Sequence, residues 1–223
     1  MPLSGPDGAQ MWFDQFVRHF RADAANPRTE LGSMYRKREE CRQNWSYSDQ
    51  ELSDNMASFL SRLALDMGYF QEWQTTKRRY DFTWFIGKGG KDRVVIEHEN
   101  NPYSTKRSEV PKLLKSAAPL RVLITYSNGN PRRLEGLLSS TEKVISKHWA
   151  GRKAGEFLLV LGKRRVYNPA SWIGFRWKEN DKMYQWLTTQ HRERECASCG
   201  GPFTPWSRQE GWCYSCERVH WGG

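Results

Sequence analysis

Two nearly continuous apolar runs constrain the fold of this chain more than any other feature. Residues 120–126 read LRVLITY, and residues 156–161 read EFLLVL. Runs without polar alternation are typical of strands that are buried on both faces of a sheet. Between them Leu134, Leu138 and Ile145 recur at helical spacing, which predicts a helix over residues 130–149. The pattern therefore favours an α/β domain whose sheet is covered by helices.

More strands are expected on either side of these runs. Residues 69–75, 79–86 and 93–99 are rich in aromatic and β-branched side chains, and residues 171–178 have the same character. The sequence GKGGKD at 87–92 predicts a hairpin between the second and third of these strands.

Two further helices are expected in the same region. Ser48 and Glu51 have capping-box spacing at the start of one helix, and Gly68 follows its last turn. The other begins near Ser108 and ends at Pro119. The predicted order is αβββαβ around a mixed central sheet flanked by helices.

The first 47 residues precede this core. Trp12, Phe16 and Phe20 recur on one face of a helix, whereas residues 22–44 are polar and are expected to form a linker with room for a short helix. The chain is thus predicted to contain an N-terminal helix and charged linker, an α/β core, and a C-terminal metal-binding module, at residues 1–47, 48–190 and 191–223.

The charge of the chain favours a polyanionic partner. Of the 223 residues, 35 are Lys or Arg and 25 are Asp or Glu, which gives a net charge of +10. No stretch has the twenty or so apolar residues of a membrane span, and no signal-peptide pattern is seen at the start. These observations predict a cytoplasmic protein without a membrane segment.

Four cysteines in the last 30 residues predict a zinc site. They form two C-x-x-C pairs separated by 13 residues, a spacing that places four thiolates around one tetrahedral structural Zn²⁺: Cys196, Cys199, Cys213 and Cys216. Such a module can act as a staple for the C-terminus, or it can help to bind nucleic acid. A complete set of four thiolates leaves no open position for catalysis by zinc.

Three acidic residues fall in the predicted strands. Asp81 lies in the strand 79–86, and Glu97 and Glu99 lie in the strand 93–99. Alternation puts Glu97 and Glu99 on one face and His98 on the other, and the hairpin allows Asp81 to join them. Buried carboxylates need a neutralising cation, and hard oxygen ligands suit Mg²⁺ or Mn²⁺.

The Asp81 and Glu97-x-Glu99 arrangement, in this order of elements, resembles the PD-(D/E)XK, or restriction-endonuclease-like, nuclease superfamily. The resemblance covers about residues 49–161 and implies that Asp81, Glu97 and Glu99 bind the metal and catalyse phosphodiester hydrolysis. Tyr80 replaces the family's Pro, and Glu99 replaces its Lys, as in a Glu-x-Glu subgroup of restriction enzymes. Alternatively, a Lys comes from elsewhere, with Lys112 or Lys91 as candidates.

Other residues have two readings each. Glu51 either supports the metal site from the first core helix, as in the resembling family, or simply caps that helix. Lys112 either faces the site or pairs with Glu109 on the surface. Asp81, Glu97 and Glu99 themselves could be ordinary solvated strand residues.

The sequence therefore predicts a Mg²⁺- or Mn²⁺-dependent endonuclease that acts on nucleic acid, with DNA as the expected substrate. A homodimer would allow a double-strand cut. The alternatives are a non-catalytic nucleic-acid-binding protein that uses the basic surface and the zinc module, and a zinc-stapled adaptor for protein interactions.

Overall fold

The structure is a computed structural model that describes residues 8–40, 49–73, 80–87, 90–100, 108–127, 131–149, 155–163 and 172–178, with three short strands nearer the C-terminus. The helices are α1 (Gly8–Ala25), α2 (Glu30–Glu40), α3 (Asp49–Asp66), α4 (Val110–Leu114) and α5 (Pro131–Trp149). The strands are β1 (Phe70–Trp73), β2 (Phe82–Phe85), β3 (Asp92–Glu99), β4 (Leu120–Ser127), β5 (Glu156–Lys163), β6 (Ile173–Lys178), β7 (Gln185–Leu187), β8 (Arg194–Glu195) and β9 (Pro202–Phe203).

Seven of the described strands form one mixed sheet in the order β1 to β7. The β2–β3 hairpin is antiparallel, as the sequence predicted, whereas β3, β4 and β5 run parallel to one another. From α3 to β4 the chain therefore follows the predicted αβββαβ order. β7 adds a strand that the sequence pattern did not indicate.

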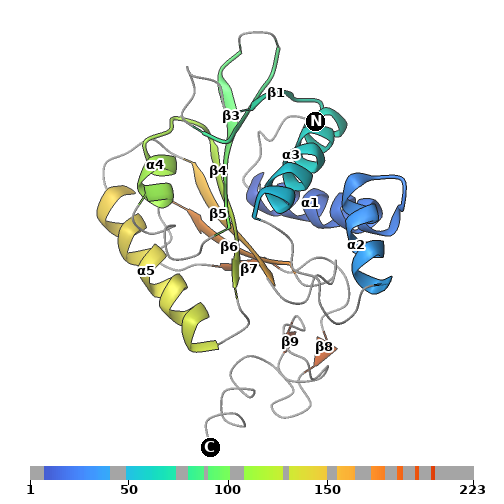
Figure 1. Ribbon diagram of the computed structural model, residues 1–223. Coiled ribbons are helices and arrows are strands. Elements are labelled where there is room, and N and C mark those ends of the chain that lie inside the picture. Colours follow the sequence, from blue (N-terminus) through green and yellow to red (C-terminus); the bar gives the residue numbers. More distant parts are fainter. Residues whose placement is uncertain are drawn as a thin grey trace, which may run out of the picture.

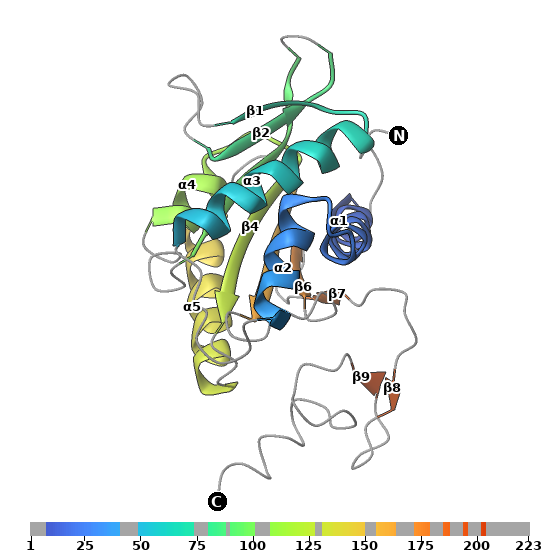
Figure 2. The ribbon, with the colours of Figure 1, turned by 45° about the vertical axis from the view of Figure 1, so that its right-hand side comes forward.

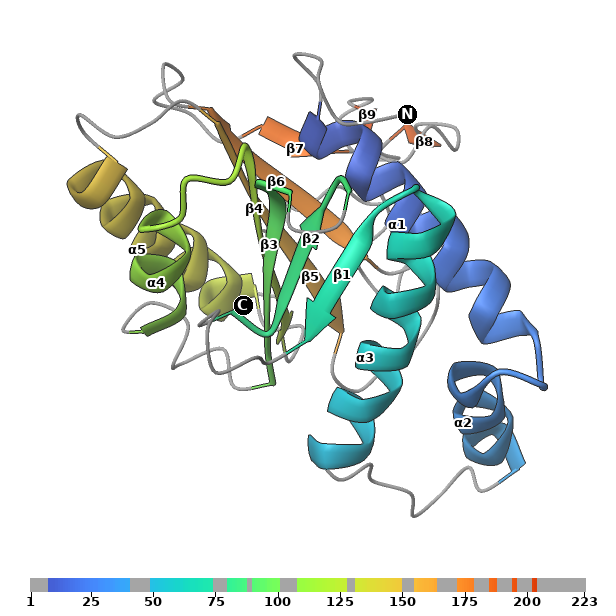
Figure 3. The same cartoon turned by 90° about the horizontal axis from the view of Figure 1, so that it is seen from above.

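Helices cover both faces of the sheet, and Figure 3 shows these layers from above. α4 and α5 lie on one side, and α1, α2 and α3 lie on the other (Figure 1). The apolar side chains divide in the same way. Val94 and Ile96 of β3 belong to the cluster with α1 and α3, while Val95 between them belongs to the cluster with α4 and α5. The strand alternation thus decides which helices each residue of β3 contacts.

The N-terminal helices pack on the sheet. α1, seen nearly end-on in Figure 2, lies beside α3. Its Trp12 ring is 5.7 Å from Trp84 of β2, and its Phe16 ring is 5.0 Å from Trp172 near β6. α2 buries Leu31 and Met34 in the same core. Residues 22–40 are thus not only a linker, because two apolar residues in a polar sequence anchor an 11-residue helix.

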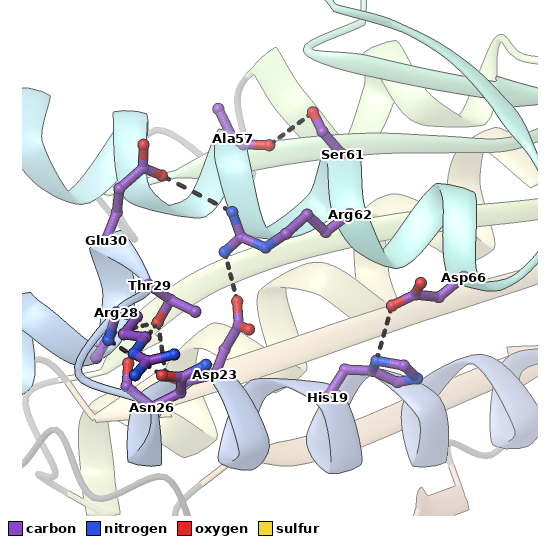
Figure 4. Close-up of polar contacts among 11 residues, drawn as sticks. His19, Asp23, Asn26, Arg28, Thr29, Glu30, Ala57, Ser61, Arg62 and Asp66 are labelled. Atoms are coloured by element: carbon purple, nitrogen blue, oxygen red, sulfur yellow. Dashed lines mark hydrogen bonds and ion pairs between the residues drawn. The ribbon is translucent and has the colours of Figure 1, made fainter.

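Polar contacts join these three helices at their solvent side (Figure 4). Arg62 of α3 pairs with Asp23 at the end of α1, and its Nη1 atom lies 3.9 Å from Glu30 Oε2 of α2. His19 Nδ1 of α1 lies 3.2 Å from Asp66 Oδ2 of α3. These contacts are partly exposed, so each adds little free energy. The apolar core supplies the packing of the three helices, and these ion pairs fix how the helices are aligned along one another.

The N-terminal end of α1 is hydrogen-bonded to a residue that is distant in the sequence. The backbone N–H of Ala9 donates a hydrogen bond to Glu156 Oε2, the first residue of β5, over 2.8 Å. Arg176 Nη1 of β6 lies 3.6 Å from the other carboxylate oxygen of Glu156. A carboxylate at a helix N-terminus satisfies an otherwise unpaired backbone donor. None of the described helices is long and apolar enough to cross a membrane.

Candidate metal and phosphate site

The β2–β3 hairpin places Asp81 beside Glu97. Phe82 pairs with Ile96, so Asp81, one residue earlier, adjoins Glu97, one residue later, on the antiparallel strand. Both positions lie on the face that packs under α4 and α5, because Val95 on that face belongs to their core. Asp81 Oδ2 also accepts a hydrogen bond from the backbone N–H of His98 over 2.9 Å. The expectation that the hairpin brings these two acids to one face is confirmed.

Glu97 is a buried carboxyl group. Its residue is 2% exposed, which is rare for a glutamate. Burial, the negative charge of Asp81 and a hydrogen bond with Glu109 raise the pKa of Glu97 to about 9, although Lys112 acts in the opposite direction. A carboxyl group in this position strongly favours a nearby cation or a bound proton.

Lys112 of α4 supplies a cation at this point. Its Nζ atom lies 2.7 Å from Glu97 Oε1 and 3.6 Å from Glu109 Oε2. Burial alone would lower the pKa of Lys112, but the hydrogen bond and charge of Glu97, with the charges of Glu109 and Asp81, raise it above its ordinary value. The Lys112 side chain is 31% exposed, so the ammonium group has a route to solvent.

Packing of α4 fixes the position of this ammonium group. Val110, Leu113 and Leu114 are buried, so the polar side of the short helix turns toward the site. Tyr80, which precedes Asp81, packs against the same core, and its hydroxyl lies 3.5 Å from the Lys112 carbonyl oxygen. Tyr80 thus links the Asp81 segment to the helix that carries Lys112.

Glu109 belongs to the same cluster, contrary to the reading of a simple surface pair with Lys112. It occupies the N-cap position of α4, but its side chain makes no capping hydrogen bond. The carboxyl group instead approaches Lys112 and Glu97. The only sequence signal for this arrangement is the spacing of three residues between Glu109 and Lys112, which is common on helix surfaces.

Glu99 lies two residues beyond Glu97 on the same face of β3, opposite Thr125 of β4. Its backbone carbonyl accepts a hydrogen bond from Thr125 Oγ1 over 2.7 Å. Within the described ranges, no group of three or more His, Cys, Asp or Glu residues is arranged to hold a metal ion. The structure therefore brings Asp81 and Glu97 together with Lys112, without a preformed three-carboxylate site that includes Glu99.

His98 lies on the opposite face of β3, as alternation predicted. Its Nε2 atom is 2.9 Å from the Tyr126 hydroxyl of β4, and the two rings are in a T-shaped contact. Burial lowers the pKa of His98 to about 4. The ring is therefore neutral at physiological pH, and it is separated from Glu97 by the sheet.

Glu51 is exposed and lines a separate cavity of about 440 Å³ between α2 and α3. From α3, Ser53 contacts the end of β3, where its hydroxyl accepts a hydrogen bond from Asn100 Nδ2 over 2.9 Å. Ser48, the expected capping partner of Glu51, lies outside the described residues.

Lys91, the other candidate lysine, is exposed at the start of β3, at the opposite end of the strand from Glu97.

The four predicted zinc ligands, Cys196, Cys199, Cys213 and Cys216, also lie outside the described residues. The nearest described elements are β8 and β9, which pair as an antiparallel two-stranded sheet and stand on either side of the first C-x-x-C pair in the sequence.

No protein-family model matches this chain, and no curated protein is similar to it.

Proposed function

We propose that this protein is a Mg²⁺- or Mn²⁺-dependent endonuclease that hydrolyses phosphodiester bonds in DNA, with a restriction-endonuclease-like core. The observation that carries the proposal is the contact of Glu97 with Lys112 beside Asp81. Two acids meet at the strand positions where the resembling nucleases place metal ligands, and a lysine from α4 lies on the same face of the sheet.

The chemistry of this cluster fits a hard divalent cation. Asp81 and Glu97 offer carboxylate oxygens, which are the ligands that Mg²⁺ and Mn²⁺ prefer. A cationic group, the Lys112 ammonium, already lies among them at 2.7 Å from Glu97 Oε1. The position therefore attracts positive charge. Asp81 and Glu97 are the residues that would hold the ion, with Glu99 as a further ligand or as the base for a water molecule.

A bound divalent ion would lower the pKa of a coordinated water and offset the charge that develops on the scissile phosphate. The protein's own groups have separate tasks. The hydrogen bond from the His98 N–H orients the Asp81 carboxylate. The backbone of β3 thus fixes the direction of the second carboxylate oxygen. Lys112, on α4, can stabilise the negative charge of the phosphate. Lys112 would thus perform the role of the motif lysine, whose position in this sequence is occupied by Glu99.

The charge of the chain supports a polynucleotide substrate. A net charge of +10 favours association with a polyanion through counterion release. The proposed Cys₄ module would bind one structural Zn²⁺, and it would act either as a staple or as an additional contact to DNA.

A second function is a non-catalytic nucleic-acid-binding protein with the same fold. The observation that favours it is again the Lys112–Glu97 contact, because an internal ion pair can neutralise a buried acid without any metal. In this case the carboxylate cluster is structural, and the basic surface and the zinc module bind the nucleic acid.

The test is a cleavage assay on plasmid, linear DNA and RNA, in Mg²⁺, Mn²⁺ or EDTA. The wild-type protein is compared with Glu97→Ala, and Asp66→Asn serves as the control because Asp66 is a surface acid on α3. The nuclease proposal expects metal-dependent cleavage that Glu97→Ala abolishes and Asp66→Asn retains. Salt-sensitive binding without cleavage in either metal would favour the second function instead.

A further inference from the structure

The position of the Lys112 ammonium raises a question for the proposed metal site. The Glu97 oxygen that would bind a divalent ion is already in contact with this ammonium, at 2.7 Å. A metal–carboxylate bond and a lysine contact of this length cannot use the same side of the same oxygen. An ion that binds on this side of Oε1, rather than through the second oxygen of Glu97, would displace the ammonium.

The surrounding geometry provides a place for it to go. Lys112 Nζ lies 3.6 Å from Glu109 Oε2, which is longer than a hydrogen bond, and that oxygen is buried and has no hydrogen-bond partner. A lysine side chain has four rotatable bonds, so a shift of the ammonium toward Glu109 needs no movement of the helix. The Glu109 side chain does not cap α4, so the helix N-terminus does not hold its carboxyl group in place.

We propose that Lys112 is an exchangeable internal counter-ion, which leaves Glu97 for Glu109 when a divalent cation binds. In the metal-free protein the ammonium occupies the position beside the buried Glu97 carboxyl group. When the ion is bound, Glu109 would hold the ammonium. Lys112 thereby limits metal affinity, and Glu109 is a positioning residue that acts through Lys112. This inference rests on the proposed metal-dependent function.

The test measures Mn²⁺ binding by calorimetry, independently of cleavage. Lys112→Met removes the competing cation, and we expect it to bind Mn²⁺ about tenfold more tightly than the wild type, a coupling of ordinary size for directly interacting groups. Lys115→Met is the matched control, because it removes the same charge from an exposed position at the end of the same helix. Its affinity should stay within about twofold of the wild type if the effect is a local contact rather than general charge.

Glu109→Gln completes a double-mutant cycle. Alone, it should weaken Mn²⁺ binding, because the displaced ammonium loses its acceptor. In the Lys112→Met background the same change should have little effect, whereas a direct metal ligand would weaken binding in both backgrounds. Lys112→Gln, which keeps a donor for Glu97, replaces Lys112→Met if the latter fails to fold as judged by circular dichroism.

Two results would overturn the inference and leave the nuclease proposal standing. One is Mn²⁺ binding by Lys112→Met that is no tighter than binding by Lys115→Met. The other is an equal loss from Glu109→Gln in both backgrounds. Failure of the wild type and all variants to bind Mn²⁺ would instead remove the metal site itself, and the proposed function with it.

Discussion

Asp81 accepts a hydrogen bond from the backbone N–H of His98, with 2.9 Å between Oδ2 and the nitrogen. This bond ties the side chain at the start of β2 to the backbone of β3, directly beside Glu97. The position of Asp81 therefore depends on the hairpin rather than on a metal ion.

The first prediction concerns Asp81→Asn. The Asn oxygen can still accept the hydrogen bond from His98, so the fold should be retained, but the negative charge needed for metal binding is lost. We expect an unchanged thermal unfolding midpoint and no metal-dependent cleavage of plasmid DNA. Full cleavage activity in this variant would show that Asp81 has no role in the chemistry.

The second prediction concerns the buried acid. The pKa of Glu97 is raised from 4.5 to about 9, so the folded state holds this proton more tightly than the unfolded state does. Its contribution to stability is complete below the ordinary pKa and is lost as the pH rises toward 9, by at most about 1.4 kcal/mol per pH unit. Glu97→Gln should remove this loss. Urea unfolding in EDTA at pH 5, 7 and 9 should show the free energy of unfolding of the variant rising relative to that of the wild type at each step. The same pH dependence in both proteins would contradict the assignment.

The third prediction concerns the other face of β3. Burial lowers the pKa of His98 from 6.5 to about 4, so the folded state disfavours the protonated ring. The contribution of the neutral His98 ring to the stability of the folded state is complete above pH 6.5 and is lost as the pH falls toward 4. Between pH 7 and 5, urea unfolding should show a smaller decline in the stability of His98→Gln than in that of the wild type. Tyr126→Phe serves as the control, since it removes the hydrogen-bond partner but keeps the titrating ring.

The fourth prediction compares two glycines. A Cβ atom at Gly162 of β5 would lie 2.7 Å from Trp172 and 2.9 Å from Tyr126, both ring atoms in the core, whereas a Cβ atom at Gly136 of α5 meets nothing within 4 Å. Gly162→Ala should destabilise the protein by about 1–3 kcal/mol. Gly136→Ala should stabilise it by about 0.5–1 kcal/mol, because alanine is the better helix former. Chemical denaturation of the two variants measures both values.

The fifth prediction concerns the C-terminal cysteines. Purified protein should contain one zinc ion per chain by elemental analysis, and Cys199→Ser or Cys216→Ser should lose it. Cys41→Ser, which changes the single cysteine outside the two pairs, should retain the metal. Equal zinc content in all three variants would exclude the proposed Cys₄ ligand set.

The elements from α3 to β6 and the faces of the β3 residues could be predicted from the sequence, because both follow from local patterns. The apolar runs located β4 and β5, and the alternation along β3 separated Glu97 from His98. These inferences need only the period of a strand and one hairpin.

The surroundings of Glu97 could not be predicted in the same way. The contact between Lys112 and Glu97 depends on how α4 packs on the sheet, and the approach of Glu109 depends on a missing capping bond. Glu51 shows the same limit, since the way α3 packs on the sheet turns Ser53 toward the end of β3 and Glu51 toward the pocket beside α2. Such contacts are set by tertiary packing, which local sequence patterns do not encode.

The bond from Ala9 to Glu156 has a consequence for biosynthesis. α1 leaves the ribosome before β5 and β6, and two of the partners that anchor it, Glu156 and Trp172, are synthesised about 150 residues later. Domains begin to fold during synthesis from the N-terminal side, and exposed apolar surface in that interval promotes aggregation. The aromatic face of α1 must therefore be covered by chaperones or by other parts of the nascent chain until β5 and β6 are synthesised. Slowing translation of that final stretch should lower the soluble yield of this protein.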